Sequence, residues 1–170
     1  MQMNPCKYGY SVVDGSTIQL SLIRGANCSD DITINDQGEH EFSYSIIPHK
    51  GDFRHADIPK KALEFNNPLK VTTAKNGSGK LGREYSFIST DNDNVIIDTV
   101  KKAENSDAVI VRLYDCFNIK GKVTLKCGFG FKRAYLCDLL ENKESELKQD
   151  GECVSFDMSN YEIITIMFEL

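Results

Sequence analysis

The chain has 170 residues, of which 41% are hydrophobic and 26% are charged, and its formal net charge at pH 7 is −5. This composition is typical of a folded globular protein and excludes a disordered chain. The acidic balance disfavours nucleic acid and anionic membrane surfaces as partners, because both repel an acidic protein at long range. The length fits one ordinary domain or two small β domains with a buried core.

The sequence carries no targeting or membrane signal. No apolar run approaches the roughly 20 residues that span a bilayer, and residues 1–5 lack the basic and apolar regions of a signal peptide. The six cysteines lie far apart, with neither a Cys-x-x-Cys pair nor a histidine at zinc-ligand spacing. We therefore expect a cytoplasmic protein whose cysteines are free thiols rather than disulfides or metal ligands.

The first half of the chain begins with a predicted hairpin. Residues 16–23 alternate apolar and polar side chains, and the preceding Asp14-Gly15 dipeptide accepts the positive φ angles of a tight turn. Residues 8–13 and 16–23 should therefore pair, and residues 41–46 show the same alternation. At residues 57–65 an aspartate, an early proline and spaced apolar residues predict a short helix.

The same period of two continues to the end of the chain, separated by polar loops at 75–80 and 142–151. About ten strands in a chain of this length predict an all-β, antiparallel sandwich architecture. The further predicted strands are 69–74, 85–89, 94–100, 108–114, 122–126, 134–140, 153–156 and 162–168.

Histidine is the scarcest catalytic residue type in the chain, with three residues. His40, His49 and His55 lie in one short window together with acidic residues, and such a set can bind a divalent metal or act as acid and base. Their spacing, however, matches no known ligand pattern. Hydrogen-bonded loop histidines are the favoured interpretation.

Carboxylate pairs, the usual machinery of glycoside hydrolysis, form three local clusters: Asp30 with Asp31, Asp91 with Asp93, and Asp138 with Glu141. Each lies in a polar, turn-rich context, where aspartates that cap turns are the commoner explanation. No serine lies in a Gly-x-Ser-x-Gly elbow, and no phosphate-binding glycine loop is complete. Catalytic residues are therefore not assigned.

Lys7, Tyr8 and Tyr10 surround Gly9 before the first hairpin and are candidates for contacts with a ligand or a neighbouring domain.

Taken in order, many short segments together resemble the C-terminal region of glycoside hydrolase family 38 α-mannosidases, in particular the bacterial and cytosolic branch. The resemblance extends over nearly the whole chain. The segments are Asn4-Pro-Cys-Lys-Tyr-Gly-Tyr10, Asp14-Gly15, Leu20-Ser-Leu-Ile-Arg24, Gly38-Glu-His-Glu-Phe-Ser-Tyr44, Pro48-His-Lys-Gly-Asp-Phe53, Phe65-Asn-Asn-Pro-Leu69, Ser86-Phe-Ile-Ser89, Val100-Lys-Lys-Ala-Glu104, Val111-Arg-Leu-Tyr114, Cys137-Asp-Leu-Leu-Glu141 and Tyr161-Glu-Ile-Ile-Thr165.

The resemblance implies a fold and a division of labour. Residues 1–100 would be a portion of a mutarotase-like β-sandwich, and residues 101–170 a small terminal β-sandwich. In the family, a divalent metal, usually zinc, and catalytic aspartates lie on an N-terminal domain that no part of this chain matches. The segment would then hold no cofactor, and it would support that absent domain in a retaining α-mannosidase that acts on α-mannoside substrates.

The resemblance also suggests where substrate would come nearest. Lys7, Tyr8 and Arg24 border the first hairpin, where the similarity is tightest, and are the predicted substrate-rim residues. A start at Met1 inside the larger sandwich implies a truncated fragment with exposed sheet edges, which predicts edge pairing or a homo-oligomer. The alternative function is a stand-alone carbohydrate-binding or protein-interaction β-sandwich without hydrolase activity.

Overall fold

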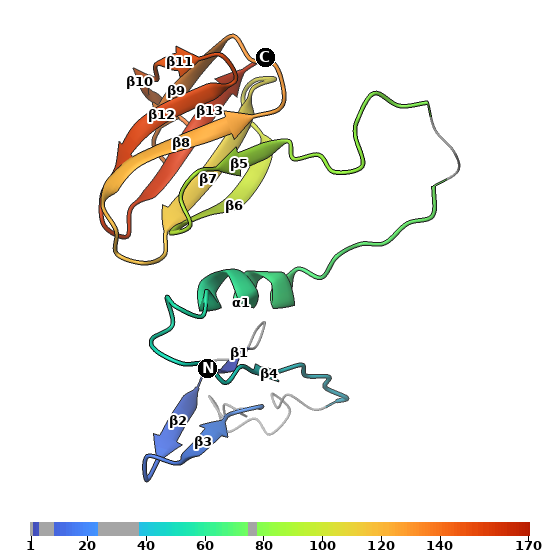
Figure 1. Ribbon diagram of the computed structural model, residues 1–170, viewed down its shortest axis with the longest axis vertical. Helices are drawn as coiled ribbons and strands as arrows, with labels where there is room; N and C mark the ends of the chain where they lie inside the picture. Colours follow the sequence, from blue (N-terminus) through green and yellow to red (C-terminus); the bar gives the residue numbers. More distant parts are fainter. Residues whose placement is uncertain (1, 4–8, 24–37, 75–77) are drawn as a thin grey trace, which may run out of the picture. The chain divides into compact units, whose positions relative to one another are not determined.

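The computed structural model describes residues 2–3, 9–23, 38–74 and 78–170, and it divides the chain into two compact units, Met1–Thr72 and Thr73–Leu170 (Figure 1). Within the described ranges, all strand pairs are antiparallel, strands dominate the second unit, and α1 (Ile58–Asn66) is the one α-helix. The predicted all-β architecture is therefore confirmed.

In the first unit, two small pairs of strands form. β2 (Tyr10–Val13) and β3 (Thr17–Leu20) make the predicted hairpin, with Tyr10 opposite Leu20 and Val13 opposite Thr17. Asp14 and Gly15 have φ angles of 53° and 68°, which is the left-handed geometry that a tight hairpin turn requires. The second pair joins β1 (Gln2–Met3) to β4 (Ser45–Ile46), so the predicted strand 41–46 is reduced to its last two residues.

The helix of the first unit forms close to where the sequence predicts it. Asp57 occupies the N-cap position as expected, but it has a φ of 51° and its side chain makes no capping hydrogen bond. Ile58 is fully buried. The predicted strand at 69–74 is wrong: these residues form no strand, and Leu69 and Val71 are almost completely exposed. An alternating pattern yields a strand only when a neighbouring strand is available to pair with it.

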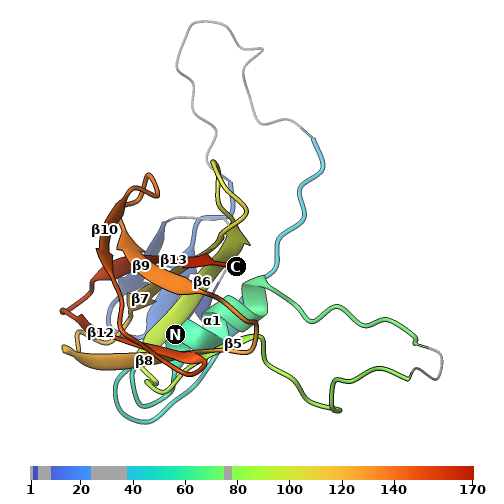
Figure 2. The same ribbon diagram turned by 90° about the horizontal axis from the view of Figure 1, so that it is seen from above.

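The second unit is a two-layered sandwich of antiparallel sheets (Figures 1 and 2). One sheet has five strands in the order β10-β9-β13-β7-β6, and the other has four in the order β11-β12-β8-β5. The strands are β5 (Ile88–Thr90), β6 (Val95–Lys102), β7 (Val109–Asp115), β8 (Gly121–Cys127), β9 (Arg133–Cys137), β10 (Lys143–Glu146), β11 (Gln149–Asp150), β12 (Cys153–Met158) and β13 (Ile163–Glu169).

Most predicted strands of this unit are confirmed, but three segments differ. The strand predicted at 85–89 begins only at Ile88, as β5. The strand predicted at 134–140 ends at Cys137, because the chain then turns at Asp138. The stretch 142–151, predicted as a turn, instead contains β10 and β11, whose side chains are exposed and so lack the apolar alternation of a half-buried strand. The predicted boundary between residues 100 and 101 falls inside β6, which pairs with β7 from Val95 to Lys102.

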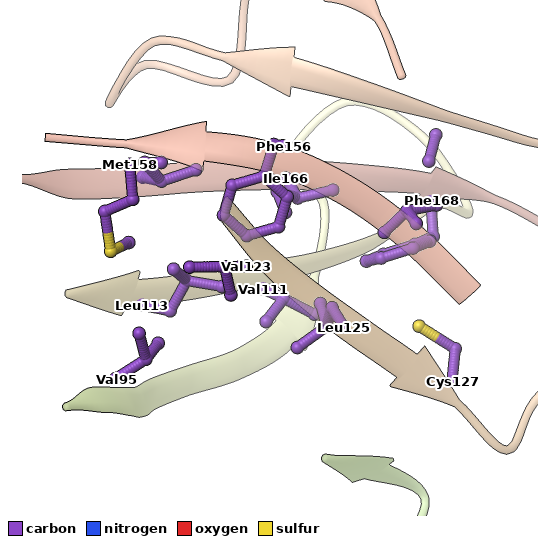
Figure 3. Packing of buried hydrophobic residues seen from close by; sticks show 13 residues of the cluster. Val95, Val111, Leu113, Val123, Leu125, Cys127, Phe156, Met158, Ile166 and Phe168 are labelled. Atoms are coloured by element: carbon purple, nitrogen blue, oxygen red, sulfur yellow. The ribbon is translucent and has the colours of Figure 1, made fainter. Parts of the chain in front are cut away.

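The core lies between the two sheets and is built by the inward-facing residue of each alternating pair (Figure 3). Val111 and Leu113 of β7 and Leu125 of β8 are fully buried there. Phe168 of β13 closes one end, with its ring 5.6 Å from that of Phe129 and 5.0 Å from that of Phe131, both edge to face. Such aromatic contacts add to the hydrophobic stabilisation of the sandwich.

A buried carboxylate, that of Asp115, fastens one end of the sandwich. Asp115 is only 2% exposed, yet its two oxygens accept four hydrogen bonds. The donors are the Asn94 side chain at 2.8 Å and the backbone N–H groups of Phe117 at 3.1 Å, Ile119 at 2.9 Å and Tyr161 at 2.9 Å. These donors belong to the β5–β6, β7–β8 and β12–β13 connections, so one side chain holds three loops together.

The hydrogen bonds also decide the charge of Asp115. Burial alone would raise the pKa of this carboxyl, but the Asn94 amide and the three backbone N–H groups outweigh burial and lower the pKa below its usual value. Asp115 is therefore ionised at neutral pH. A buried charge that is fully hydrogen-bonded in this way stabilises the fold, whereas the loss of its donors would leave it unpaired.

The close contact at Gly128 gives a first test of the packing between β8 and the segment before β5. The Tyr85 hydroxyl donates a hydrogen bond to the Gly128 carbonyl at 2.6 Å, and a Cβ atom at Gly128 would lie 2.8 Å from that hydroxyl and 2.9 Å from the Ser86 carbonyl. We expect Gly128→Ala to lower the free energy of unfolding by about 1–3 kcal/mol in urea titrations followed by circular dichroism. Gly130→Ala is the matched control, since a Cβ there meets no atom within 4 Å. Equal stability of the two variants would contradict this packing.

Asp115 gives a second test, with a defined pH dependence. We expect Asp115→Asn to lower the free energy of unfolding at pH 7 by about 1–3 kcal/mol, because an amide cannot accept all four hydrogen bonds. The pKa of Asp115 is lowered on folding, so its contribution is complete above the unfolded value of about 3.9 and is lost as the pH falls through the lower native value. The difference between wild type and variant should therefore shrink below about pH 4. Asp157→Asn, at an exposed position of β12, is the control; a constant difference from pH 7 to pH 2 would refute the assignment.

Candidate functional site

The predicted substrate-rim residues Lys7, Tyr8 and Arg24 lie outside the described residues, so their role stays a prediction. Tyr10, which adjoins them, begins β2 and is exposed. Of the carboxylate clusters, Asp30 and Asp31 also lie outside the described ranges. The remaining candidates can be placed in the structure.

The histidines do not converge on a common point. The His55 Nδ1 atom lies 2.9 Å from Asp52 Oδ1, and this hydrogen bond is the main cause that lowers the pKa of Asp52. His40 instead stacks on Phe42, with their ring centroids 6.1 Å apart. Across residues 2–3, 9–23, 38–74 and 78–170, no group of three or more His, Cys, Asp or Glu side chains is placed to hold a metal ion. This part of the chain therefore does not offer the donor set of a zinc site.

The other carboxylates are held in turns. Asp91 Oδ1 accepts a hydrogen bond from the backbone N–H of Thr124 at 2.8 Å. Asp138 Oδ1 accepts from the N–H groups of Leu140 and Asn142, both at 2.9 Å, and Asp138 Oδ2 accepts from the Asn142 side chain at 2.8 Å. These bonds lower the pKa of Asp138, chiefly through the Asn142 side chain. The turn-capping interpretation is thus confirmed for Asp138, whereas the hydrogen bond of Asp91 links its turn to β8.

The connection between β9 and β10, residues 138–142, reaches over the outer face of the five-stranded sheet. The Leu139 carbonyl accepts a hydrogen bond from Arg112 Nη2 of β7 at 2.9 Å. The Glu141 side chain is 6% exposed; its Oε1 lies 2.8 Å from Lys101 Nζ of β6, and its Oε2 accepts from the Glu104 N–H at 2.8 Å. The hydrogen bond from Lys101 is the main cause that lowers the pKa of Glu141. The loop that joins β9 to β10 is therefore anchored to β7 and β6, which lie toward the other edge of the same sheet.

This loop covers polar atoms on the outer face. Arg112 of β7 and Thr165 of β13 are register partners, and both point away from the core because their neighbours Val111 and Ile166 point into it. Arg112 Nε and Thr165 Oγ1 are buried without a hydrogen-bond partner. Sequence reasoning placed Asp138 and Glu141 in a turn but gave no signal for their reach to Lys101 and Arg112, because those strands are distant in sequence.

Two shallow depressions flank the loop on this face. The first, of about 480 Å³, is lined by Cys137, Asp138, Leu139, Leu140, Glu144, Ile163 and Thr165; we call it the leucine surface. The second, of about 380 Å³, has a lining that includes Asn105, Asp107, Lys143 and Glu169. Lys143 pairs with Glu169 and lies 4.3 Å from the centroid of the Tyr135 ring. The second depression therefore contains an ion pair, whereas the two charged residues that line the first, Asp138 and Glu144, are both acidic.

The four described cysteines, Cys116, Cys127, Cys137 and Cys153, are free thiols, as expected; Cys6 and Cys28 lie outside the described residues. Cys127 is fully buried in the core, and burial raises the pKa of its thiol to about 12. A thiol in this state is neither a nucleophile nor a metal ligand at neutral pH. Within the described ranges, no helix has the length and apolar character needed to cross a bilayer.

Known proteins similar to this chain are α-mannosidases. α-Mannosidase G of Dictyostelium discoideum is 34% identical over 176 residues, which cover 98% of this chain and 15% of that protein. Human α-mannosidase 2C1 is 32% identical over 173 residues, covering 99% of this chain and 16% of that protein. The α-mannosidase of Saccharomyces cerevisiae is 32% identical over 157 residues, covering 83% and 14%. The chain therefore spans less than a fifth of the length of these curated relatives.

A family match covers most of the sandwich. Residues 94–166 match the family described as "Glycosyl hydrolases family 38 C-terminal beta sandwich domain". The match begins at Asn94, the donor to Asp115, and ends inside β13, so it includes the loop at 138–142 and every strand of the two sheets except β5. The chain therefore belongs to the C-terminal region of family 38 glycosyl hydrolases, and residues 94–166 are the beta sandwich domain of that family.

Proposed function

We propose that this chain is the non-catalytic C-terminal β region of an α-mannosidase, and that it supports a catalytic domain elsewhere in the same polypeptide. The observation that carries the proposal is the extent of the similarity: 98–99% of the chain aligns with only 15–16% of α-mannosidases. The parent protein would hydrolyse α-mannosidic bonds with retention, act in the cytoplasm and hold its zinc in the catalytic domain.

The exposed apolar side chains of the first unit support this role. The hairpin β2–β3 exposes Tyr10, Val12 and Ile18, and Leu69 and Val71 are exposed after the helix. Val12 and Ile18 are register partners, so they share one face of the hairpin with Tyr10, and exposed apolar residues grouped in this way are typical of interfaces. A further part of the polypeptide would cover them, and Lys7, Tyr8 and Arg24 would then lie at the border between this region and the catalytic domain.

The geometry of the second unit supports a scaffolding role rather than chemistry of its own. Asp91, Asp115, Asp138 and Glu141 are each engaged by hydrogen bonds or ion pairs that fix loops. The pKa values of Asp115, Asp138 and Glu141 are lowered, whereas a general acid that acts near neutral pH needs a raised pKa. The carboxylates are therefore suited to holding the surface of the sandwich in a fixed shape.

Activity measurements test the proposal. We expect the 170-residue chain with added zinc to release no product from an aryl α-mannoside, and we expect it to bind the polypeptide encoded upstream of it, raising the activity and the thermal stability of that polypeptide. Product release by the chain alone would contradict the non-catalytic role. Binding of mannose by the isolated chain in calorimetry, together with no binding to the upstream polypeptide, would favour the stand-alone carbohydrate-binding alternative. Sedimentation of the isolated chain tests the predicted homo-oligomer.

A further inference from the structure

The leucine surface holds large apolar side chains in water. Leu139 is 61% exposed, Leu140 81% and Ile163 63%. β9 and β13 are antiparallel, and Thr165 of β13 lies opposite Cys137 of β9. Ile163, two residues before Thr165, is therefore at the same end of the strands as Leu139, two residues after Cys137. The three side chains line one depression, with Leu140 the most exposed at its border. Exposed leucines at single positions are common, but three large aliphatic residues around one depression are typical of a binding surface.

The loop that carries Leu139 and Leu140 has a fixed conformation, so these side chains stay exposed. The Asp138 side chain accepts two hydrogen bonds from Asn142 at the base of the loop and one from the Leu140 N–H, and the Asp138 N–H donates to the Asn142 carbonyl at 3.1 Å. At the tip, Glu141 adopts a φ of 69°, a left-handed conformation that is unfavourable for glutamate. Its contacts with Lys101 and the Glu104 N–H hold it there. The fold thus presents Leu139 and Leu140 in a fixed geometry, so little conformational entropy is lost when a partner binds.

The charges of the lining identify the kind of partner. Among the residues that line the depression, Asp138 and Glu144 are charged, and both are acidic. A second copy of this chain placed face to face would bring these carboxylates against their own counterparts, which electrostatic repulsion disfavours. An apolar segment flanked by lysine or arginine side chains would satisfy both the leucines and the carboxylates.

The similarity to longer proteins identifies where that segment lies. Relatives align with this chain through only 15–16% of their length, so most of an α-mannosidase polypeptide is available as an occupant. We infer that the leucine surface is the docking site of the terminal sandwich for the remainder of the α-mannosidase polypeptide, through an apolar segment with a basic rim. This inference rests on the proposed function and adds to it the residues that make the contact.

Binding of the upstream polypeptide to surface variants tests the inference. We expect Leu139→Asn/Leu140→Asn to weaken the binding of the 170-residue chain to the upstream polypeptide by about tenfold or more, because the burial of two leucine side chains at the interface would be lost. The unfolding midpoint of the isolated variant should match that of wild type, since both side chains are already exposed. Val100→Asn, at a 54% exposed position of the edge strand β6, is the matched control and should bind as wild type does.

A photo-crosslinking residue at position 140 identifies the occupant directly. Crosslinks to an upstream peptide that contains apolar and basic residues would support the inference, and crosslinks between two copies of the chain would overturn it. Equal binding by wild type and the double variant would also overturn it, while leaving the proposed function intact. If wild type itself does not bind the upstream polypeptide, the proposed function fails and the docking site fails with it.

Discussion

The terminal sandwich depends on one buried carboxylate at the end where three of its loops meet. Asp115 closes β7, and its hydrogen bonds reach the turn before β6, the turn after β7 and the turn before β13. Two of the nearby residues, Asn118 and Tyr161, have left-handed backbones that are unfavourable in isolation. Because the Asp115 carboxylate accepts hydrogen bonds from three loops, it fixes the positions of these loops relative to one another. The strands that follow the loops therefore enter the sheets in a fixed register, and this register determines which side chains meet in the core.

On the outer face of the five-stranded sheet, a second set of charged contacts fixes the loop at 138–142. Glu141 is anchored to β6 and to the β6–β7 connection, and the Leu139 carbonyl is anchored to β7. The loop therefore moves with the sheet rather than independently of it. The loops of such a sandwich are rigidly attached to its sheets. Rigidity of this kind is expected of a domain that holds another domain in position.

The alternation of apolar and polar residues was enough to locate β8 and β12, because each has one face in the core and one outside it. The inward-facing apolar residues located β7 and β13, although these central strands carry buried residues on both faces. The alternation failed at 69–74, where the pattern exists without a partner strand, and at β10, where a strand has no buried face. The importance of Asp115 and Glu141 was not visible, since both depend on donors that come together only in the folded sheet. The sequence pattern therefore predicts the layers well and the polar contacts between loops poorly.

The burial of Cys127 has a practical consequence for the chain. Its thiol lies in the core at the end of β8, and its pKa of about 12 keeps it protonated and unreactive as long as the sandwich is closed. Alkylating reagents and peroxide gain access only when β8 separates from its neighbours β12 and β5. The rate at which the Cys127 thiol is modified therefore reports how often the domain opens. Mass spectrometry of the one peptide that contains Cys127 measures this rate, even in a mixture of proteins.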